Sequence, residues 1–278
     1  MAYFLGVDLG GTNFKAGLVN EGVILSKVTN SVNRNTSKAD LIQTLFNTID
    51  SIITNKVKGI GVGVPGVLDP ITGIIYNILN LPMWEEVPLK QLLEQRYHLP
   101  VFLNNDANCF AKGEKIYGRG KSYSNFAGMT IGTGLGMGVI LNDKLYSGIF
   151  CGAGEIGMVT YKDSIIEHYA SSLFFERTYN QNTKEMSKLA FQGDANAIQA
   201  FQEFGVHLGN AINNVLYMFA PEAIIMGGSI SKSFALFQKS MEETVNTFAY
   251  PNQIKNLKIE ISSLSGIAIL GAAALCVD

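Results

Sequence analysis

Two glycine-rich segments of the sequence carry residue types that suit phosphate binding, and the first is GVDLGGTNFK near the N-terminus. Gly10 and Gly11 lack the Cβ atoms that would keep backbone N–H groups away from an oxyanion. Thr12 and Lys15 add a hydroxyl and a cation. Asp8 would repel a phosphate, and it better suits Mg²⁺ held through water. A tight glycine hairpin between two strands would explain the same residues equally well.

The second segment, IGTGLGMGVI, repeats the pattern of the first. A strand, a Gly/Thr turn, an apolar strand, an Asn-led turn and a third strand run in this order from Phe4 and again from Phe126. We interpret this order as an internal duplication. A third cluster, Gly227 and Gly228, follows another apolar strand, where an adenosine could pack close to the backbone. Each cluster alone could be an ordinary turn, but three of them at strand ends favour nucleotide binding.

Hydrophobic periodicity predicts the elements that must position these turns. The first half is predicted to hold strands at 3–9, 14–20, 23–30, 57–64 and 100–104 and helices at 38–53, 89–97 and 106–117. The second half is predicted to hold strands at 125–131, 223–226 and 257–261 and helices at 195–220, from Ser231 or Ser233 to 248, and at 266–276. A strand, a helix and a strand in succession predict parallel pairing within α/β layers.

The element order predicts an α/β protein with two lobes and a cleft between them. This is the two-lobed actin-like or ribonuclease H-like ATPase fold, with duplicated βββαβαβα lobes. We expect an N-terminal lobe at 1–118 and a C-terminal lobe at 119–265. The alanine-rich helix at 266–278 is expected to pack back on the first lobe.

Composition narrows the partners that such a protein could have. With 47% hydrophobic and 16% charged residues among 278, the chain can bury two cores. A net charge of −2 without a Lys/Arg cluster argues against nucleic acid. The longest strongly apolar run, 267–277, is too short to span a bilayer, so no membrane partner is expected. Three scattered cysteines and no signal peptide favour a cytoplasmic location.

Several segments, in order, resemble the signatures of ROK (repressor, open reading frame, kinase) proteins. They are DLGGTNFKAGLV, GVGVPGVLD, NNDANCFAKGE, IGTGLGMGVI, GAGEIG and IIMGGSIS. The resemblance implies ATP-dependent phosphorylation of a hexose or hexose derivative bound between the lobes, glucokinase-like, with transfer to the 6-hydroxyl. ATP and Mg²⁺ are the implied cofactors. Members of the family are often dimers or tetramers, so a homo-oligomer is possible here.

The resemblance makes Asp106, in NNDAN, the catalytic base. A sugar hydroxyl attacks the γ-phosphoryl group better when a carboxylate accepts its proton, and a helix N-terminus favours the ionised carboxylate. Without the resemblance, an N-cap aspartate would be the simpler interpretation. The expected sugar-binding residues are Gly66, Asn80, Asn105, Asp106, Glu155 and Glu167. The expected nucleotide-binding residues are Asp8, which would also hold Mg²⁺, Gly10, Gly11, Thr12, Asn13, Lys15, Gly132, Thr133, Gly134, Gly136, Gly227 and Gly228.

Three residues near these motifs have two interpretations each. Trp84, the only tryptophan, could stack on a sugar face, although a lone tryptophan more often packs in a core. Asn104 can simply finish its strand. Glu167 can be a sugar ligand or a glutamate placed by a helix dipole.

The sequence departs from the family pattern after GAGEIG. Many ROK proteins continue with a histidine and a cysteine-rich segment that together bind a structural zinc. Here Met158 stands in place of the histidine and 159–166 contains no cysteine, so we expect no zinc site. In zinc-bearing relatives that histidine also reaches the sugar, and His168 could partly compensate. The identity of the sugar therefore stays open.

Other functions fit the same motifs less well. Kinases for N-acetylhexosamine, mannose, fructose or a β-glucoside remain open within the same class. A sugar-sensing ROK repressor would carry a helix-turn-helix domain ahead of the first phosphate strand, and only Met1 and Ala2 precede it here. A pseudo-enzyme or a different ATPase of the same architecture, such as an actin-like protein, is a third alternative. The presence of Asp106, Asp8, Lys15 and both phosphate turns argues against a dead enzyme.

Overall fold

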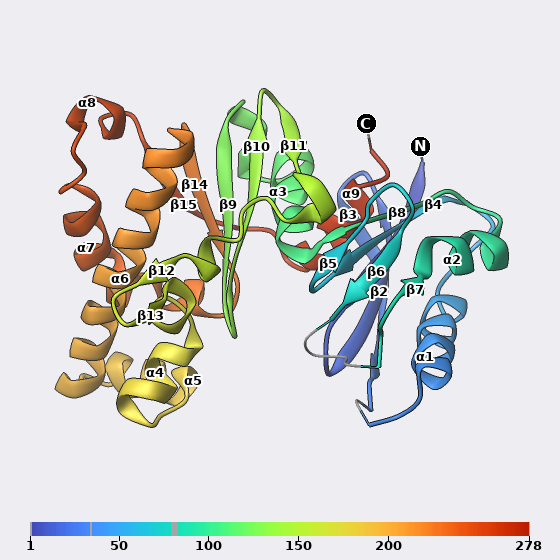
Figure 1. Cartoon of the computed structure of the whole chain (residues 1–278), viewed down its shortest axis with the longest axis horizontal. Coiled ribbons are helices and arrows are strands. Elements are labelled where there is room, and N and C mark those ends of the chain that lie inside the picture. The colour runs from blue at the N-terminus through green and yellow to red at the C-terminus, as the bar shows by residue number, and fades with distance from the viewer. Residues whose placement is uncertain (1, 34, 79–82, 278) are drawn as a thin grey trace.

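The computed structural model describes residues 2–33, 35–78 and 83–277, and it contains two five-stranded mixed sheets (Figure 1). The first sheet holds β1 (Tyr3–Leu9), β2 (Asn13–Asn20), β3 (Val23–Ser31), β4 (Val57–Val64) and β8 (Val101–Asn105). The second sheet holds β9 (Phe126–Ile131), β10 (Leu135–Leu141), β11 (Lys144–Tyr146), β14 (Ala223–Gly227) and β15 (Lys258–Ile261).

The two sheets have the same topology. Their strand orders are β3-β2-β1-β4-β8 and β11-β10-β9-β14-β15. In each sheet the first three strands pair antiparallel and the last two join in parallel. The predicted duplication requires such a match, and it places the two glycine turns at equivalent corners, between β1 and β2 and between β9 and β10.

Helices and small sheets complete the two lobes. The helices are α1 (Lys38–Asp50), α2 (Leu89–Tyr97), α3 (Asp106–Tyr117), α4 (Ser172–Tyr179), α5 (Thr183–Phe191), α6 (Ala195–Phe219), α7 (Phe234–Val245), α8 (Pro251–Ile254) and α9 (Ile267–Ala274). The small sheets join β5 (Val67–Leu68), β6 (Ile74–Asn77) and β7 (Val87–Pro88), and β12 (Thr160–Tyr161) with β13 (Ser164–Ile165). The 3-10 helices are η1 (Arg119–Ser122), η2 (Ile149–Cys151), η3 (Ile156–Met158), η4 (Ile166–His168) and η5 (Ile230–Ser233).

Helix boundaries differ from the prediction where capping or turn geometry decides them. The helix predicted at 38–53 ends at Asp50. Ser233 stands at the N-cap position of α7, which starts at Phe234, but its side chain makes no capping hydrogen bond and lies 2.8 Å from Ser187 Oγ instead. Ser231 lies earlier, in η5. Helices α4 and α5 were not predicted. In contrast, Ser37 caps α1 as expected, accepting a hydrogen bond from the backbone N–H of Asp40.

A row of glycines lets α9 pack directly on the first sheet. Gly6 on β1 pairs with Gly61 on β4, and both face α9. A Cβ atom at Gly6 would lie 2.0 Å from the carbonyl oxygen of Ile269, and one at Gly61 would lie 1.8 Å from that of Ala272. Only glycine permits such a close approach, so the C-terminal helix lies on the first lobe, as expected.

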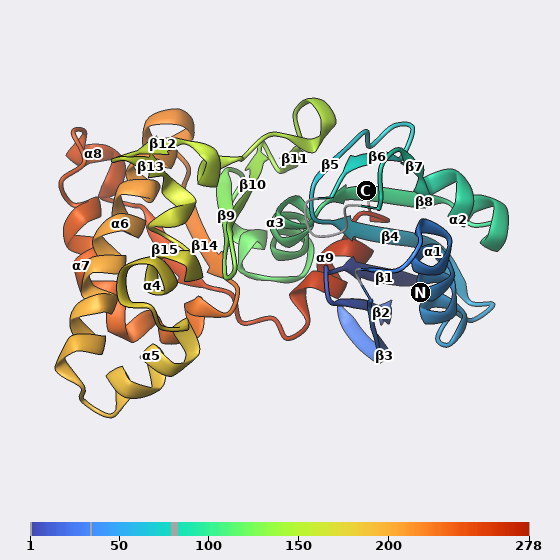
Figure 2. The same ribbon diagram turned by 60° about the horizontal axis from the view of Figure 1, so that its bottom comes forward.

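Helix α3 packs in the same way on the second sheet. Gly128 and Gly138 are paired on β9 and β10, and a Cβ atom at Gly138 would lie 2.5 Å from the carbonyl oxygen of Ala107. Figure 2 shows α3 and α9 side by side between the two lobes. Each lobe is thus covered by the helix that follows the last strand of the other. The division at residue 118 stays a prediction, although it assigns α3 to the first lobe.

The chain crosses between the lobes after α3 and again before α9, and Glu114 joins the two crossings. Its side chain is fully buried. It accepts hydrogen bonds from the backbone N–H of Arg119, at 3.0 Å, and from the hydroxyl of Ser262. A buried carboxylate needs such donors, since an unpaired one would be costly to desolvate.

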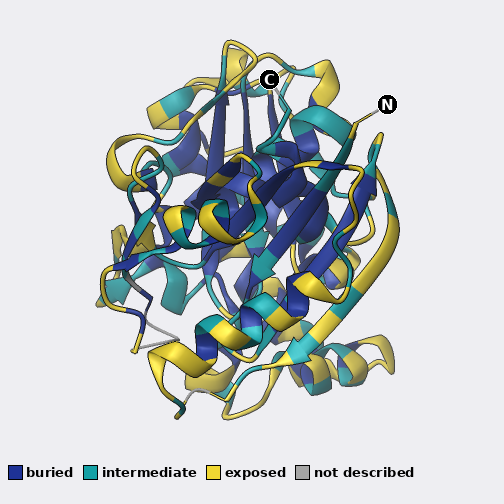
Figure 3. Ribbon diagram, turned by 90° about the vertical axis from the view of Figure 1, so that its right-hand side faces the viewer, coloured by how far each residue is buried: buried dark blue, intermediate teal, exposed yellow. Residues whose placement is uncertain are grey.

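Each lobe has its own hydrophobic core. One cluster gathers β1, β2, β4 and α1, and the larger one gathers β9, β10, β14, α4, α6 and α7. Figure 3 shows the inner strands of the sheets buried, whereas β3 and the outer faces of the peripheral helices are largely exposed. Across the described part of the chain, no helix is long and apolar enough to cross a membrane.

Candidate active site

The first glycine turn joins β1 to β2 at the end of these two inner strands of the first sheet. The backbone N–H of Gly10 donates to the carbonyl oxygen of Asn13 at 2.9 Å, and Thr12 is exposed at the tip. Behind the turn, Lys15 Nζ lies 2.9 Å from Asp8 Oδ2, as their cross-strand register allows. The segment is therefore a hairpin, and its exposed tip still presents a hydroxyl beside a Lys–Asp pair.

The second glycine turn joins β9 to β10 and lies against two other predicted segments. Its backbone closes through a 3.0 Å hydrogen bond from the Gly132 N–H to the Gly134 carbonyl, and Thr133 is exposed. Gly228, with φ of 93°, packs against the end of β9, where a Cβ atom would lie 2.3 Å from the Ile131 carbonyl oxygen. The fold thus brings the second and third glycine clusters together.

Two of the predicted nucleotide residues lie against α3. A Cβ atom at Gly136 would lie 2.9 Å from the Cβ atom of Ala107, and one at Gly227 would lie 2.4 Å from the Phe110 ring. Both neighbours belong to α3. The absence of a side chain at these positions is explained by the close approach of α3, without a ligand.

The segment NNDAN lies at the end of β8, and its residues meet the predicted Gly66. Asn105 is the N-cap of α3 and accepts a hydrogen bond from the Ala107 N–H at 2.8 Å. Its amide nitrogen reaches the carbonyl oxygen of Gly66 at 3.5 Å. Asp106 is the first residue of the helix. The structure therefore places three predicted sugar-binding residues, Gly66, Asn105 and Asp106, side by side.

The carboxyl of Asp106 has an altered proton affinity. Its surface is accessible to water, but protein surrounds it on most sides, and this desolvation raises its pKa from 3.8 to about 6. The charges of Asp8 and Glu155 raise the pKa further, and the Ala107 N–H opposes them. The helix N-terminus favours the ionised form through the Ala107 N–H, but desolvation has the larger effect on this pKa. A carboxylate with this pKa remains mostly ionised at neutral pH.

Glu155 and Glu167 form the second part of the acidic group. Partial burial raises the pKa of Glu155, and the charge of Glu167 adds to this effect. Glu167 Oε2 accepts the Leu135 N–H at 2.9 Å, directly after the second glycine turn. Glu167 lies in η4, which is a 3-10 helix. Asp8, Asp106, Glu155 and Glu167 thus form a chain of neighbouring carboxylates from the first turn to the second.

Trp84 does not face a sugar site. It is 0% exposed and packs 5.8 Å from the ring of Phe14 in the first-lobe core. The core interpretation of this residue is therefore the one that the structure supports. Asn80, a predicted sugar-binding residue, lies outside the described residues.

Because Trp84 is the only tryptophan, its burial predicts the intrinsic fluorescence of the protein. We expect a blue-shifted emission in the native state, weak quenching by acrylamide, and a red shift on unfolding in urea. Steady-state fluorescence with an acrylamide titration checks this. Strong quenching of the native protein would contradict the burial of Trp84.

The segment that replaces the family's zinc-binding region folds as the β12–β13 hairpin. Met158 precedes it and is 61% exposed. His168 Nδ1 lies 2.6 Å from Ser164 Oγ and 2.7 Å from Arg177 Nη1, so His168 contacts its own lobe. Among the residues that the structure describes, no group of three or more His, Cys, Asp or Glu could hold a metal ion. The absence of zinc stays a prediction.

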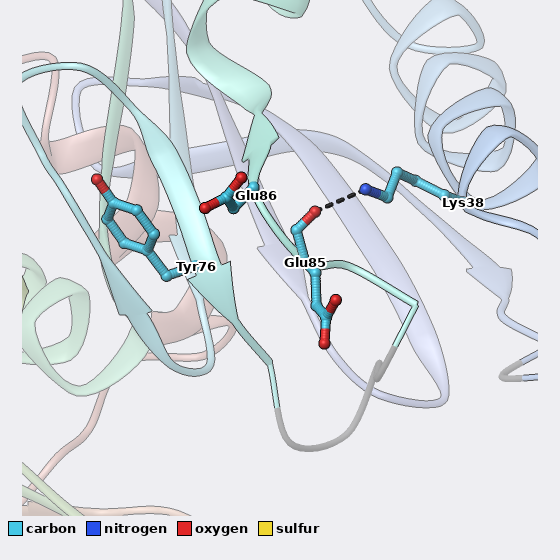
Figure 4. Close-up of a pocket in the computed structure, with 4 residues that line it drawn as sticks. All are labelled: Lys38, Tyr76, Glu85 and Glu86. Atoms are coloured by element: carbon cyan, nitrogen blue, oxygen red, sulfur yellow. Dashed lines mark hydrogen bonds between the residues drawn. The ribbon is translucent and has the colours of Figure 1, made fainter.

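Two surface pockets lie elsewhere. One, of about 480 Å³, is lined by Lys38, Tyr76, Glu85 and Glu86, and Lys38 Nζ donates to the Glu85 carbonyl at 2.6 Å (Figure 4). The other, of about 590 Å³, lies on the outer side of α6 and α7. Among the described residues, none of the predicted site residues lines either pocket. The four neighbouring carboxylates of Asp8, Asp106, Glu155 and Glu167 are the better candidate for chemistry, because the predicted site residues gather around them.

The sequence is similar to that of known proteins over nearly its whole length. The sequence profile of the ROK family matches residues 4–278 of the 278 residues, which is nearly the whole chain. The chain belongs to the ROK family. Glucokinase from Thermotoga maritima is 31% identical over 304 residues, covering 98% of this chain and 96% of that protein. The xylose repressor of Bacillus subtilis is 29% identical, covering 99% of this chain and 77% of the repressor.

A solved ROK structure supports the fold. The ROK family glucokinase from Streptomyces griseus, in complex with glucose and AMPPNP, superposes with a TM-score of 0.84 at 27% identity, covering 99% of both chains. This ROK protein therefore has the two-lobed actin-like ATPase fold that its sequence predicts. The ROK family contains both kinases and repressors, so membership alone does not decide between them.

Proposed function

We propose that this ROK protein is an ATP-dependent sugar kinase that transfers the γ-phosphoryl group to a hydroxyl of a hexose, glucokinase-like and at the 6-hydroxyl. The observation that carries the proposal is Asp106, a carboxylate with a pKa of about 6 beside Gly66, Asn105 and Glu155. Kinase relatives that match nearly the whole chain support it.

Asp106 would act as the general base. The carboxylate accepts the proton of the sugar hydroxyl as that oxygen bonds to the γ-phosphorus and the bond from phosphorus to the ADP oxygen breaks. A pKa near 6 leaves the group mostly ionised at neutral pH, yet more basic than an ordinary aspartate. It is thus better suited to proton acceptance.

The remaining carboxylates and amides would hold the sugar. Glu155 and Glu167 can accept hydrogen bonds from sugar hydroxyls, and Asn105 can donate one through its amide nitrogen, since its oxygen caps α3. Gly66, with φ of 147°, would let the sugar ring approach the backbone closely. The carboxylates of Glu155 and Glu167 suit a polyol, because each can accept hydrogen bonds from two hydroxyls.

The nucleotide would lie along the two glycine turns. In the first, Thr12, Asn13 and Lys15 offer a hydroxyl, an amide and a cation beside the exposed tip. In the second, Thr133 is the exposed residue, with Gly228 close behind. Gly136 and Gly227 would contribute only by allowing α3 to pack.

Asp8 fits an Mg²⁺ ion bound mainly by phosphate oxygens and water. Its side chain is 15% exposed, and Lys15 Nζ lies 2.9 Å from one of its carboxylate oxygens, Oδ2. A single carboxylate at this place suits an ion that keeps several waters. When bound, Mg²⁺ would neutralise phosphate charge during transfer.

A substrate panel tests the proposal. The purified protein, with ATP and MgCl₂, should release ADP with at least one of glucose, mannose, fructose, N-acetylglucosamine, N-acetylmannosamine and an aryl β-glucoside. Phosphorus NMR of the product identifies the phosphorylated hydroxyl. If no sugar raised ADP release above the sugar-free rate, the kinase proposal would fail. Sugar binding without turnover would then favour a sensing role.

A further inference from the structure

A short segment of the second lobe docks onto the first lobe, and we call it the strap (residues 147–154). It follows β11 and leads directly to Glu155. Cys151, at its centre, is 2% exposed and packs within the first-lobe core cluster. The neighbouring Phe150 ring meets Tyr76 of β6 edge-on, with 5.5 Å between ring centres. The contacts of Cys151 and Phe150 therefore place the centre of the strap against the first lobe.

The strap backbone is not in a conformation that its own sequence favours. Phe150 and Cys151 have φ of 53° and 61°, in the left-handed region. For residues with side chains this conformation is unfavourable, because Cβ comes too close to the following carbonyl oxygen. The neck of the loop is closed by a 3.0 Å hydrogen bond from the Ala153 N–H to the Ser147 carbonyl. Contacts outside the loop must therefore stabilise the left-handed conformation of Phe150 and Cys151.

Two asparagines of NNDAN supply such contacts. Asn104 Nδ2 donates to Ser147 Oγ at 3.0 Å. Asn108 Nδ2 lies 3.4 Å from the Cys151 carbonyl oxygen and 2.9 Å from Asn104 Oδ1. Both asparagines are buried. They flank Asn105 and Asp106 in the sequence, so one short segment touches both the strap and the reacting centre.

The end of the strap fixes where Glu155 emerges. Gly154 has φ of 92°, and a Cβ atom there would lie 2.1 Å from the carbonyl oxygen of Met137 on β10. The contact with β10 and the packing of the strap therefore both restrict the backbone directly before Glu155. From this position its charge acts on Asp106.

We propose that Asn104, at the end of β8, and Asn108, on α3, are positioning residues, which hold the strap against the segment NNDAN and so fix Glu155 relative to Asp106 for sugar binding. The inference rests on the proposed function, because it assigns Glu155 to the sugar. Neutral amides suit this task, since each can donate a hydrogen bond without adding charge beside Asp106. Sugar affinity, rather than ATP affinity, should depend on the strap.

Ser147→Ala tests the tether from the strap side, leaving NNDAN intact. We expect the KM for the best sugar of the panel to rise roughly threefold to tenfold, as for the loss of one neutral hydrogen bond, with the KM for ATP unchanged. Hydrogen exchange at residues 148–154 should become about tenfold faster. Ser147→Thr, which keeps the hydroxyl, should restore both. Ser124→Ala is the matched control, because Ser124 donates to Asp143 within the second lobe.

The outcomes separate this inference from the kinase proposal. Unchanged exchange at 148–154 in Ser147→Ala, or an equal rise in both KM values, would overturn the positioning role. The same changes in Ser124→Ala would overturn it too. If the wild-type protein phosphorylated no sugar, the proposed function would fail, and with it the sugar-positioning role. Exchange would then still show whether the serine tethers the strap.

Discussion

Replacing Asp106 by asparagine is expected to lower kcat about 10³-fold, within the range that general-base catalysis contributes. Asparagine keeps the size of the side chain but cannot accept the proton of a sugar hydroxyl. The KM for ATP should stay within about twofold, because the glycine turns are untouched. Steady-state kinetics on the substrate that the panel identifies measures both. An activity within tenfold of wild type would show that Asp106 is not the base.

The pH dependence of kcat/KM is a second measurement that tests Asp106 as the general base. Because the pKa of Asp106 is raised to about 6, the wild-type kcat/KM should rise with pH through about 6 and then level off. The folded protein holds this proton more tightly than the unfolded chain does. The contribution of Asp106 to stability should therefore fall as the pH rises from about 4 to about 6, so the difference in unfolding free energy between the wild type and Asp106→Asn should change over this range.

Asp194→Asn is the matched control for Asp106→Asn. Asp194 is the N-cap of α6 and accepts a hydrogen bond from the Ala197 N–H at 2.8 Å, so it too is an aspartate at a helix start. Asparagine caps helices equally well. The control should therefore keep both its stability and its kinetics. A comparable loss of kcat in the control would mean that the effect of Asp106→Asn is structural.

Gly61→Ala is expected to destabilise the fold by about 3 kcal/mol, at the upper end of the usual cost of overpacking. The added methyl group would lie 1.8 Å from the carbonyl oxygen of Ala272 and 2.7 Å from its carbonyl carbon. Both atoms belong to the backbone of α9, so no side chain can move aside. The helix would have to shift away from the first sheet, and with it the contact between α9 and α3.

Gly59→Ala is the control for Gly61→Ala, because Gly59 is two positions earlier on β4 and on the same face. Its nearest neighbour to an added Cβ atom is Cys276 Sγ, at 3.3 Å. This contact is with a side chain and can relax, so a loss below about 1 kcal/mol is expected. Urea unfolding followed by circular dichroism measures both variants. Equal midpoints would contradict the close packing of α9.

Much of this protein could be predicted because its motifs are local. The alternation of apolar strands and glycine turns predicted the matching order of the two sheets. The segment NNDAN predicted a strand end followed by a helix, which β8 and α3 confirm. The family resemblance, confirmed by the match over 4–278, rests on short motifs whose order survives in one sequence. Local patterns of this kind need no knowledge of distant contacts.

The glycines show where sequence patterns stop being informative. Gly132 and Gly134 form a turn, whereas Gly136 makes room for Ala107 of α3. Likewise Gly228 takes a left-handed φ, whereas Gly227 faces the ring of Phe110. A sequence shows the missing side chain but not which atom fills the space. The same holds for Trp84 and Glu167, whose neighbours come from distant segments.

The sequence by itself determined the matching order of strands in the two large sheets, the family and the segments that could do chemistry. Only the tertiary structure decided the pKa of Asp106, since desolvation and the charges of Asp8 and Glu155 come from three separate parts of the chain. It also decided that the strap docks on the first lobe through Asn104 and Asn108. Burial and charge interactions depend on distance in space, which a linear pattern of residues does not encode.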